Sequence, residues 1–190
     1  MSNFTDFFPA AGGGGGGIPK YQEFTSSGTF TPTQALIDAG GRVSFIIVGG
    51  GERGAGYPAG GGSGGGVIWG YATVTSTTGC AVTIGAGGAS NGADGGNSSV
   101  DFSSAGGTDA TAIGGQGGKE GPMFGSGRGG SQLMAAGNSG VLGYGIGGSN
   151  DYSLGGTKGY DLAAFGINSG CGSREGQIPG NGFTRITWFE

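Results

Sequence analysis

The sequence alternates between blocks with little glycine and blocks made largely of it, and this alternation restricts the fold more than any other feature. Residues 49–66, "GGGERGAGYPAGGGSGGG", hold eleven glycines in eighteen positions, while residues 18–48 hold three and residues 183–190 hold none. Glycine loses more backbone freedom on ordering than any other residue. A chain that repeatedly leaves a strand-like block for glycine either has flexible loops there or packs its backbone where no side chain fits.

Two common explanations of a high glycine content do not apply. The chain has 54 glycines in 190 residues, but it has six prolines and lacks the sustained Gly-x-y repeat that collagen requires. Disordered chains are usually charged and poor in aromatic residues, whereas here 11% of the residues are charged and 10% are aromatic. We therefore expect a folded protein with a small apolar core and a large part built from glycine.

The glycine-poor blocks have the patterns of β-strands. In "RVSFIIV", for example, Val43, Phe45 and Ile47 fall on one face of an extended strand. "TPTQALIDAGG" allows one short helical turn before Gly40 and Gly41. The other strand candidates are "KYQEFTSSGTF", "VIWGYATV", "CAVTIG", "NSSVDFSS", "TDATAIGG" and "FTRITWFE".

Seven short strands separated by turn signals predict an all-β fold, a small antiparallel β-sandwich with glycine-rich loops. Because "FTRITWFE" ends the chain, we expect it to pair with an N-terminal strand and close the domain. We also expect strands such as this one to commit their apolar residues to the small core, which leaves little for a partner. Residues 18–190 then form one domain, preceded by a peptide and glycine linker at residues 1–17.

Close packing of the backbone would explain the glycine blocks. A polyglycine type II segment has three residues per turn and no internal hydrogen bonds, so neighbouring segments must satisfy each other's buried N–H and C=O groups. A Cβ atom at such a contact would push the segments apart. The sequence favours this packing for 49–66, 85–96 and 112–182, whereas "GGGGGG" at 12–17 is typical of a flexible linker.

Charge and residue content exclude several classes of function. The net charge of −4 and only eight scattered basic residues argue against a nucleic-acid partner. The chain has no histidine, so it lacks the side chain that most catalytic triads and zinc sites use. We expect no enzyme activity and no cofactor. No apolar run approaches a membrane span, and the N-terminus lacks the pattern of a secretory signal, so Cys80 and Cys171 are expected as reduced thiols rather than as one long-range disulfide.

Carboxylates give weak signals only. Asp94 and Asp101 lie in a Gly/Asn context that resembles calcium-binding repeats, but the pattern does not recur, which favours a solvated turn. Asp151 and Asp161 would be a candidate pair for sugar hydrolysis. Twelve acidic residues are scattered along the chain, so such a pair is expected by chance.

Binding residues are better supported by the sequence. Between 119 and 182, single apolar side chains stand within glycine and follow no strand or helix period. They either fill a second small core or lie at loop tips, where Tyr and Phe with Gly, Ser and Asn are typical of binding surfaces. At the N-terminus an aromatic peptide precedes the glycine linker, and it is either a docking peptide or a disordered or self-packed tail. The candidates are Phe124, Tyr144, Tyr152, Tyr160 and Phe165 for a receptor and Phe4, Phe7 and Phe8 for attachment.

The pattern resembles the glycine-rich domain of bacteriophage tail-fibre and receptor-binding proteins over most of residues 20–190. The resemblance rests on "FTSSGTFTPTQALIDAGGRVSFIIVGGGERG", "GGGSGGG", "VTIGAGG" and "NSSVDFSSAGGTDATAIGGQGG", with the lead "SNFTDFFPAAGGGGGG". In the related distal-tip adhesins of T-even-like phages, glycine motifs form a layered sandwich of polyglycine helices, and variable loops between them bind the host.

The resemblance implies a tail component that is assembled in the bacterial host cytoplasm and ends in the virion tail. Its implied partners are other tail or fibre proteins, reached through the N-terminus, and a host outer-membrane protein or surface polysaccharide. A homo-oligomeric assembly is implied, with a trimer as one form. The alternative function is a structural virion protein, in a baseplate or a capsid decoration, that packs on neighbouring subunits.

Overall fold

The computed structural model describes residues 17–54, 62, 64–116, 173 and 178–190. These residues form eight β-strands, one short α-helix and a 3-10 turn. In chain order the elements are β1 (Pro19–Phe24), β2 (Gly28–Phe30), α1 (Gln34–Asp38), β3 (Arg42–Val48), β4 (Val67–Thr73), β5 (Cys80–Thr83), β6 (Ser98–Val100), η2 (Ser103–Ala105), β7 (Ala110–Ala112) and β8 (Phe183–Phe189).

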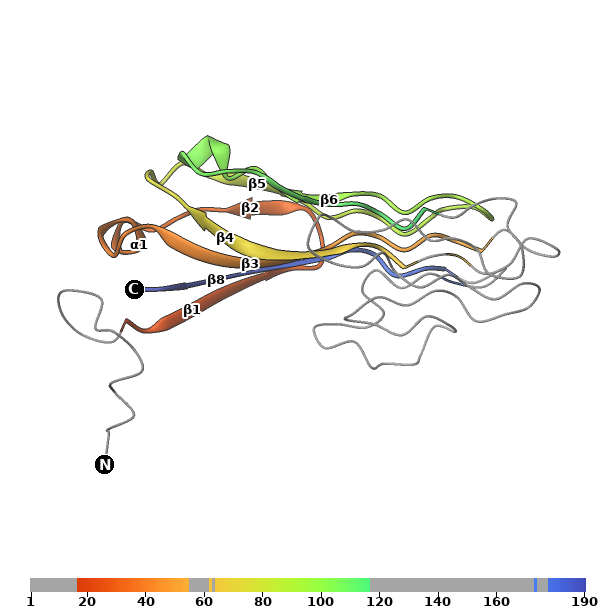
Figure 1. Ribbon diagram of the computed structural model, residues 1–190, viewed down its shortest axis with the longest axis horizontal. Coiled ribbons are helices and arrows are strands. Elements are labelled where there is room, and N and C mark those ends of the chain that lie inside the picture. Colours follow the sequence, from red (N-terminus) through yellow and green to blue (C-terminus); the bar gives the residue numbers. More distant parts are fainter. Residues whose placement is uncertain (1–16, 55–61, 63, 117–172, 174–177) are drawn as a thin grey trace, which may run out of the picture.

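The strands form two four-stranded sheets that lie face to face, so the predicted antiparallel sandwich is confirmed (Figure 1). The first sheet has the order β1-β8-β3-β4 and the second has the order β2-β5-β6-β7. Every neighbouring pair in both sheets is antiparallel. The C-terminal strand β8 pairs with β1 from Thr184 to Phe189, as predicted, and it also pairs with β3 on its other side.

Two local predictions were also tested. The block "KYQEFTSSGTF", interpreted as a strand candidate with a Ser-Ser-Gly turn after Phe24, forms two strands in different sheets, β1 and β2. The short helical turn is confirmed as α1, where Thr33 accepts a hydrogen bond from the backbone N–H of Leu36 at 3.1 Å. Gly41 ends this turn at φ +67°, and a Cβ atom there would lie 1.8 Å from the carbonyl oxygen of Val74. Only glycine fits this position.

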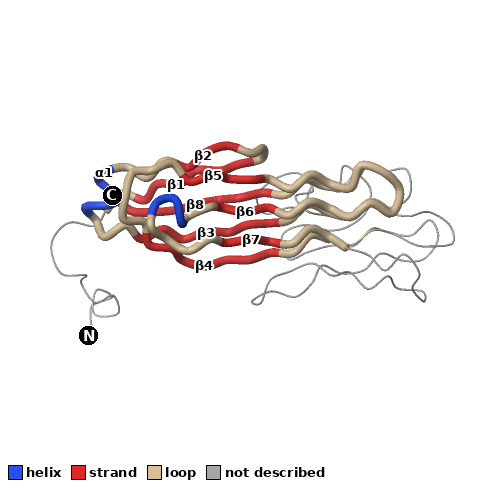
Figure 2. The backbone as a smooth tube through the Cα atoms, turned by 90° about the horizontal axis from the view of Figure 1, so that it is seen from above, coloured by secondary structure: helices blue, strands red, loops and turns tan. Residues whose placement is uncertain are grey.

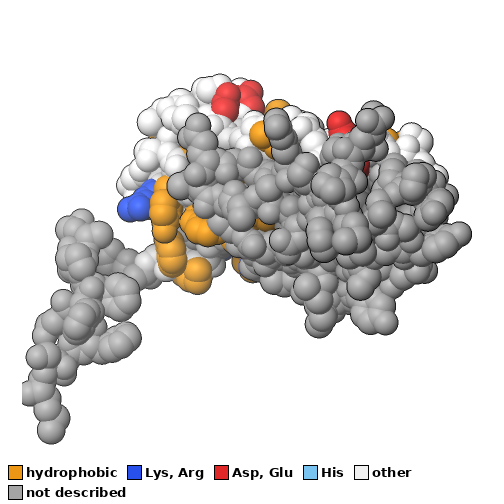
Figure 3. Space-filling view, turned by 45° about the vertical axis from the view of Figure 1, so that its right-hand side comes forward, with side chains coloured by type: hydrophobic (Ala, Val, Ile, Leu, Met, Phe, Trp, Pro, Cys, Tyr) orange, Lys and Arg blue, Asp and Glu red, His pale blue; other side chains and the backbone are white. Residues whose placement is uncertain are grey.

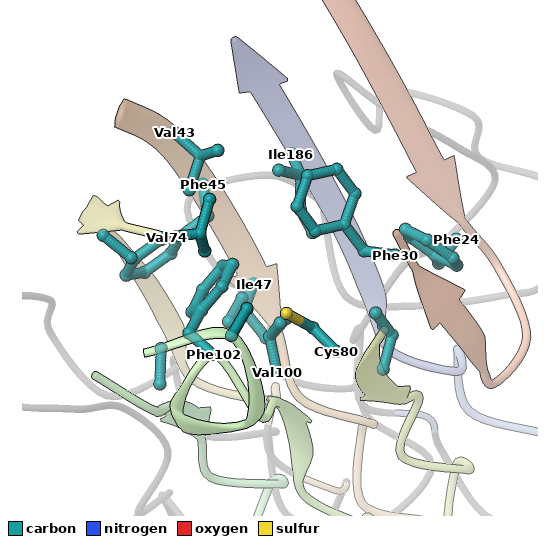
Figure 4. Packing of buried hydrophobic residues seen from close by; sticks show 14 of the residues in the cluster. Phe24, Phe30, Val43, Phe45, Ile47, Val74, Cys80, Val100, Phe102 and Ile186 are labelled. Carbon is teal, nitrogen blue, oxygen red and sulfur yellow. The ribbon is translucent and has the colours of Figure 1, made fainter. Parts of the chain in front are cut away.

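The core lies between the two sheets (Figure 4). Phe30 from the second sheet packs edge-on against Trp188 of β8, with ring centroids 5.3 Å apart. Phe45 of β3 lies 5.5 Å from Phe102, which follows β6. The alternation read from "RVSFIIV" therefore points the correct residues into the core. The other buried members include Phe24, Leu36, Val43, Ile47, Val74, Cys80, Val82, Val100 and Ile186.

Glycine segments continue six of the eight strands beyond the apolar core (Figures 1 and 2). β3 runs into residues 49–54, β5 into 85–88 and β7 into 113–116. The segments that lead into the other three strands are 64–66 before β4, 92–97 before β6 and 178–182 before β8. We call these six segments the glycine extension. It lies at the opposite end of the molecule from residue 17 and the C-terminus.

Segment 49–54 lies at the centre of the glycine extension and bonds to several neighbours. Its N–H groups at Gly50 and Arg53 donate to Gly96 and Ala93, both in segment 92–97, at 2.9 and 3.0 Å. The N–H groups of Gly51 and Gly54 donate to carbonyls of Gly180 and Ser173, which precede β8, each at 2.9 Å. Donors three positions apart therefore point in the same direction. In a β-strand, the repeat would be two.

Three of the segments also bond to one another in a closed triangle. Gly50 donates to Gly96, Gly95 donates to Gly115 at 2.8 Å, and Gly115 donates back to Gly50 at 2.7 Å. Each segment thus satisfies the backbone groups of two others, which buried peptide groups require. The glycine extension is a hydrogen-bonded part of the fold, as predicted for packed glycine in the parts of 49–66, 85–96 and 112–182 that the structure describes.

The packing leaves no space for side chains at these contacts. A Cβ atom built on Gly95 would lie 2.0 Å from the carbonyl oxygen of Gly50, and one on Gly114 would lie 2.0 Å from that of Gly95. A Cβ atom on Gly65 would lie 2.1 Å from the carbonyl oxygen of Gly49, and one on Gly50 would lie 2.2 Å from that of Ala86. The obstacle in each case is backbone, which cannot rotate away as a side chain does. The strands therefore lead into glycine because a side chain would not fit at these contacts.

Polar side chains accept hydrogen bonds from backbone N–H groups where the sheets meet the glycine extension. Ser98 accepts from the backbone N–H of Gly85 at 2.9 Å, and Asn97 accepts from that of Gly114 at 2.9 Å. Asn181 accepts from the N–H of Gly87 at 3.0 Å. At these positions the chain leaves the ladder of a sheet, and a side-chain oxygen replaces the missing backbone acceptor.

Candidate binding surface

All eight candidate residues from the sequence lie outside the described residues. These are Phe4, Phe7, Phe8, Phe124, Tyr144, Tyr152, Tyr160 and Phe165. Asp151, Asp161 and Cys171 also lie outside them. Their roles stay predictions.

The described residues do show where the segments that carry these candidates join the fold. Residues 117–172 connect Gln116 to Ser173, and residues 55–61 connect Gly54 to Gly62. Gly54 and Gly62 both donate to the carbonyl of Ser173, at 2.9 and 2.7 Å. The ends of two segments are thus hydrogen-bonded together in the glycine extension. The N-terminal segment joins at the other end, where Ile18 donates to Glu190 at 2.6 Å.

A second surface, which the sequence analysis missed, lies on the outer face of the first sheet. Three large aromatic side chains are exposed there: Tyr21 by 66%, Trp69 by 46% and Tyr71 by 68%. Tyr21 is on the edge strand β1, and the other two are on the opposite edge strand β4. The expectation that strands commit their apolar residues to the core therefore does not hold for β1 and β4. Aromatic side chains on an exposed sheet face are available for contact.

Cross-strand pairing places these aromatic residues around a polar floor. One row across the sheet runs Tyr21, Thr187, Ser44 and Tyr71. The next row runs Glu23, Arg185, Ile46 and Trp69. We call the surface formed by these two rows and Arg42 the aromatic face.

Arginines fix two of the rings on the aromatic face. The guanidinium carbon of Arg42 lies 4.4 Å from the ring centre of Tyr71, and that of Arg185 lies 5.1 Å from the ring centre of Tyr21. Both distances are typical of cation–π contacts. Arg185 also forms an ion pair with Glu23, in which its Nε donates at 2.8 Å. The face is therefore an ordered array of stacked planar groups.

An open hollow of about 230 Å³ lies in the aromatic face beside β4. Its walls include Trp69, Tyr71 and Arg185, and its floor includes Ser44 and Thr187. Ser44 donates its hydroxyl to the carbonyl of Thr187 at 3.3 Å, so its oxygen still accepts. The hollow offers both rings and hydrogen-bonding groups.

Glu23, paired with Arg185, is the acidic residue of this surface, and the carboxylates of the second sheet lie away from it. Asp101 and Asp109 belong to the loops around η2 of the second sheet, on the other side of the sandwich. In the space-filling view, acidic side chains lie along the upper edge, and a basic group lies lower on the left beside exposed hydrophobic side chains (Figure 3). The aromatic face carries two arginines against Glu23, although the whole chain has a net charge of −4.

Asp101 lies beside the turn η2, which agrees with the solvated turn that the sequence favoured there. Asp101 accepts from Ser103 Oγ at 2.7 Å, from the Ser104 N–H at 3.1 Å and from Ser104 Oγ at 2.6 Å. These bonds, with those of Ser104 first, lower the pKa of Asp101 to about 2. Among the described residues, no three His, Cys, Asp or Glu side chains are grouped as metal ligands.

Cys80 is a free thiol in the core. Its side chain is fully buried, and burial is the main cause that raises its pKa, followed by the charge of Asp101. A buried, protonated thiol is a packing group rather than a nucleophile.

A specific sequence signal for the aromatic face was present in "VIWGYATV". Trp69 and Tyr71 stand two residues apart, at the positions opposite to the buried Ile68 and Ala72. A strand with one face in water usually places polar residues there. Two aromatic residues at such positions on an edge strand indicate a contact surface.

Comparison with known proteins gave no match to a family model, to a curated protein or to a solved structure. In the part of the chain that the structure describes, no helix has the length and apolar character needed to cross a membrane.

Proposed function

We propose that this protein is a non-enzymatic bacteriophage tail component, a receptor-binding adhesin of a tail fibre or tail tip. The observation that carries the proposal is that the two segments with candidate binding residues join the fold at opposite ends of the molecule. The peptide with Phe4, Phe7 and Phe8 joins at the sandwich end, and residues 117–172 join at the glycine extension. Such a molecule is suited to attach to the virion at one end and to the host at the other.

The glycine extension supports this proposal as a rigid base for binding loops. Its three-residue repeat of hydrogen-bond directions is the period of a polyglycine II helix, and we include such helices in the proposal. A backbone lattice offers few side chains, so recognition falls to the segment it carries, 119–182, with Phe124, Tyr144, Tyr152, Tyr160 and Phe165. Binding loops on a rigid base lose less entropy on association.

Exposed apolar residues outside the aromatic face favour a second candidate, a structural virion protein. Ile18 and Ile178 are exposed by 65% and 62%. Neighbouring subunits of a baseplate, a decoration layer or a trimeric fibre would cover such positions. Copy number separates the two: a fibre needs a few to tens of copies per virion, and a decoration protein needs hundreds.

Replacing Tyr144, Tyr152 and Tyr160 by alanine is expected to weaken binding to intact host bacteria by about tenfold or more, because truncated aromatic anchors dominate losses at interfaces. The measurement is flow cytometry of a panel of bacterial strains incubated with the fluorescently labelled protein. Ile18→Ala, an exposed apolar change at the opposite end, is the control and should bind as the parent does. Binding of the triple variant equal to that of the parent, with the fold intact by circular dichroism, would refute recognition through these tips.

A further inference from the structure

The aromatic face has features that a hydrophobic partner would not need. Its rings stand beside guanidinium groups, and its lining carries the hydroxyls of Ser44 and Thr187 next to the alkyl side chain of Ile46. A purely apolar partner would remove Arg185, Ser44 and Thr187 from water and would offer them no hydrogen bonds in return. That loss is costly. The ligand must therefore combine flat apolar faces with many hydrogen-bonding groups.

We propose that the aromatic face is a binding site for an acidic glycan. Pyranose rings have flat C–H faces that stack on aromatic rings, and their hydroxyls bond to Arg, Ser and Thr side chains. Carboxylate or phosphate groups on the sugar supply the charge that complements Arg42 and Arg185. This inference deepens the proposed function and rests on it, since it names a second host-contacting site and its ligand class.

The dimensions of the face fit a chain of sugars rather than one. Tyr21 and Tyr71 end one row that crosses four strands. At a strand spacing of about 4.8 Å, the row spans roughly 14 Å, the length of a short oligosaccharide. The hollow beside β4 is open to solvent, so a sugar of the chain can enter it from the surface. Preformed cation–π pairs reduce the ordering cost of binding.

Charge selects the acidic class over neutral glycans. Arg42 stacks on Tyr71 and forms no ion pair with a described carboxylate, so its charge is available to a ligand. The acidic residues Asp101 and Asp109 are on the far side of the sandwich and do not repel an anion here. The overall charge of −4 opposes nonspecific anion binding, which makes a built, local site necessary.

The test is a printed array of oligosaccharides from bacterial capsules and lipopolysaccharides, neutral and acidic, probed with the full-length protein. We expect retention on one or more acidic glycans, and weaker retention as salt is raised. Trp69→Ala and Arg42→Gln should each lower the affinity for a retained glycan by about tenfold. Ile178→Ala, an equally exposed apolar change away from the face, should not.

Each other outcome counts against the inference. Retention of no acidic glycan, or equal affinity in Trp69→Ala, would overturn it. Concentration-dependent dimerisation that Trp69→Ala abolishes would make the face an interface between copies instead. The proposed function fails separately: if an acidic glycan is retained and Trp69→Ala lowers its affinity, but the parent labels no bacterial strain, the glycan site stands and the adhesin proposal does not.

Discussion

Gly95→Ala is expected to lower the free energy of unfolding by about 3 kcal/mol, far more than a single methyl group costs on a surface. The new Cβ atom would lie 2.0 Å from the carbonyl oxygen of Gly50 and 2.5 Å from its carbonyl carbon. Relief requires the two segments to separate, which breaks the triangle of hydrogen bonds among Gly50, Gly96 and Gly115. Urea unfolding of the purified protein measures the change.

Ala86→Val is the matched control for this prediction. Ala86 lies in the same glycine extension, but its side chain is exposed, so a larger one meets solvent. We expect a change within about 0.5 kcal/mol. Equal stability of Gly95→Ala and the control would mean that the segments do not pack as described.

Deleting residues 1–11 is expected to remove the protein from virions while leaving the domain folded. The first strand begins at Pro19, and the described core contains no residue before Phe24, so the deletion removes no described core contact. The aromatic peptide is the proposed virion anchor, and its loss should lower the copies per particle by about tenfold or more. Mass spectrometry of purified particles from a recombinant phage gives the copy number.

Two further variants sharpen the deletion experiment. Joint replacement of Phe4, Phe7 and Phe8 by alanine should reproduce the loss, because the rings are the proposed contact. Removing two glycines from 12–16 leaves the rings in place and should have little effect. Normal incorporation of the deletion variant would mean that the anchor lies elsewhere.

The sequence was sufficient for the strands but not for their order. The alternation in "RVSFIIV" identified Val43, Phe45 and Ile47 as core residues, and all three are buried. The insertion of β8 between β1 and β3 was not predictable, because strand order depends on contacts between residues more than a hundred positions apart. Glycine segments were predicted to pack, but a segment without side chains carries no pattern that specifies its neighbours.

The candidate sites show the limit of residue patterns in a different way. Isolated aromatic residues within glycine indicated a binding segment at 119–182, whereas Trp69 and Tyr71 were interpreted only as residues of a strand. Their exposure depends on β4 being an edge strand whose outer face is uncovered by the second sheet. That information exists only once the two sheets are placed.

The central claim is that the glycine blocks are an ordered, hydrogen-bonded base, and amide hydrogen exchange tests it most directly. The N–H groups of Gly50, Gly51, Gly95 and Gly115 all donate to backbone carbonyls of other segments. We expect their exchange to be slower than in an unfolded peptide by about a hundredfold or more, as for amides that open only with a cooperative unit. Exchange of these four amides at the unfolded rate, while those of β3 and β8 are protected, would contradict the claim.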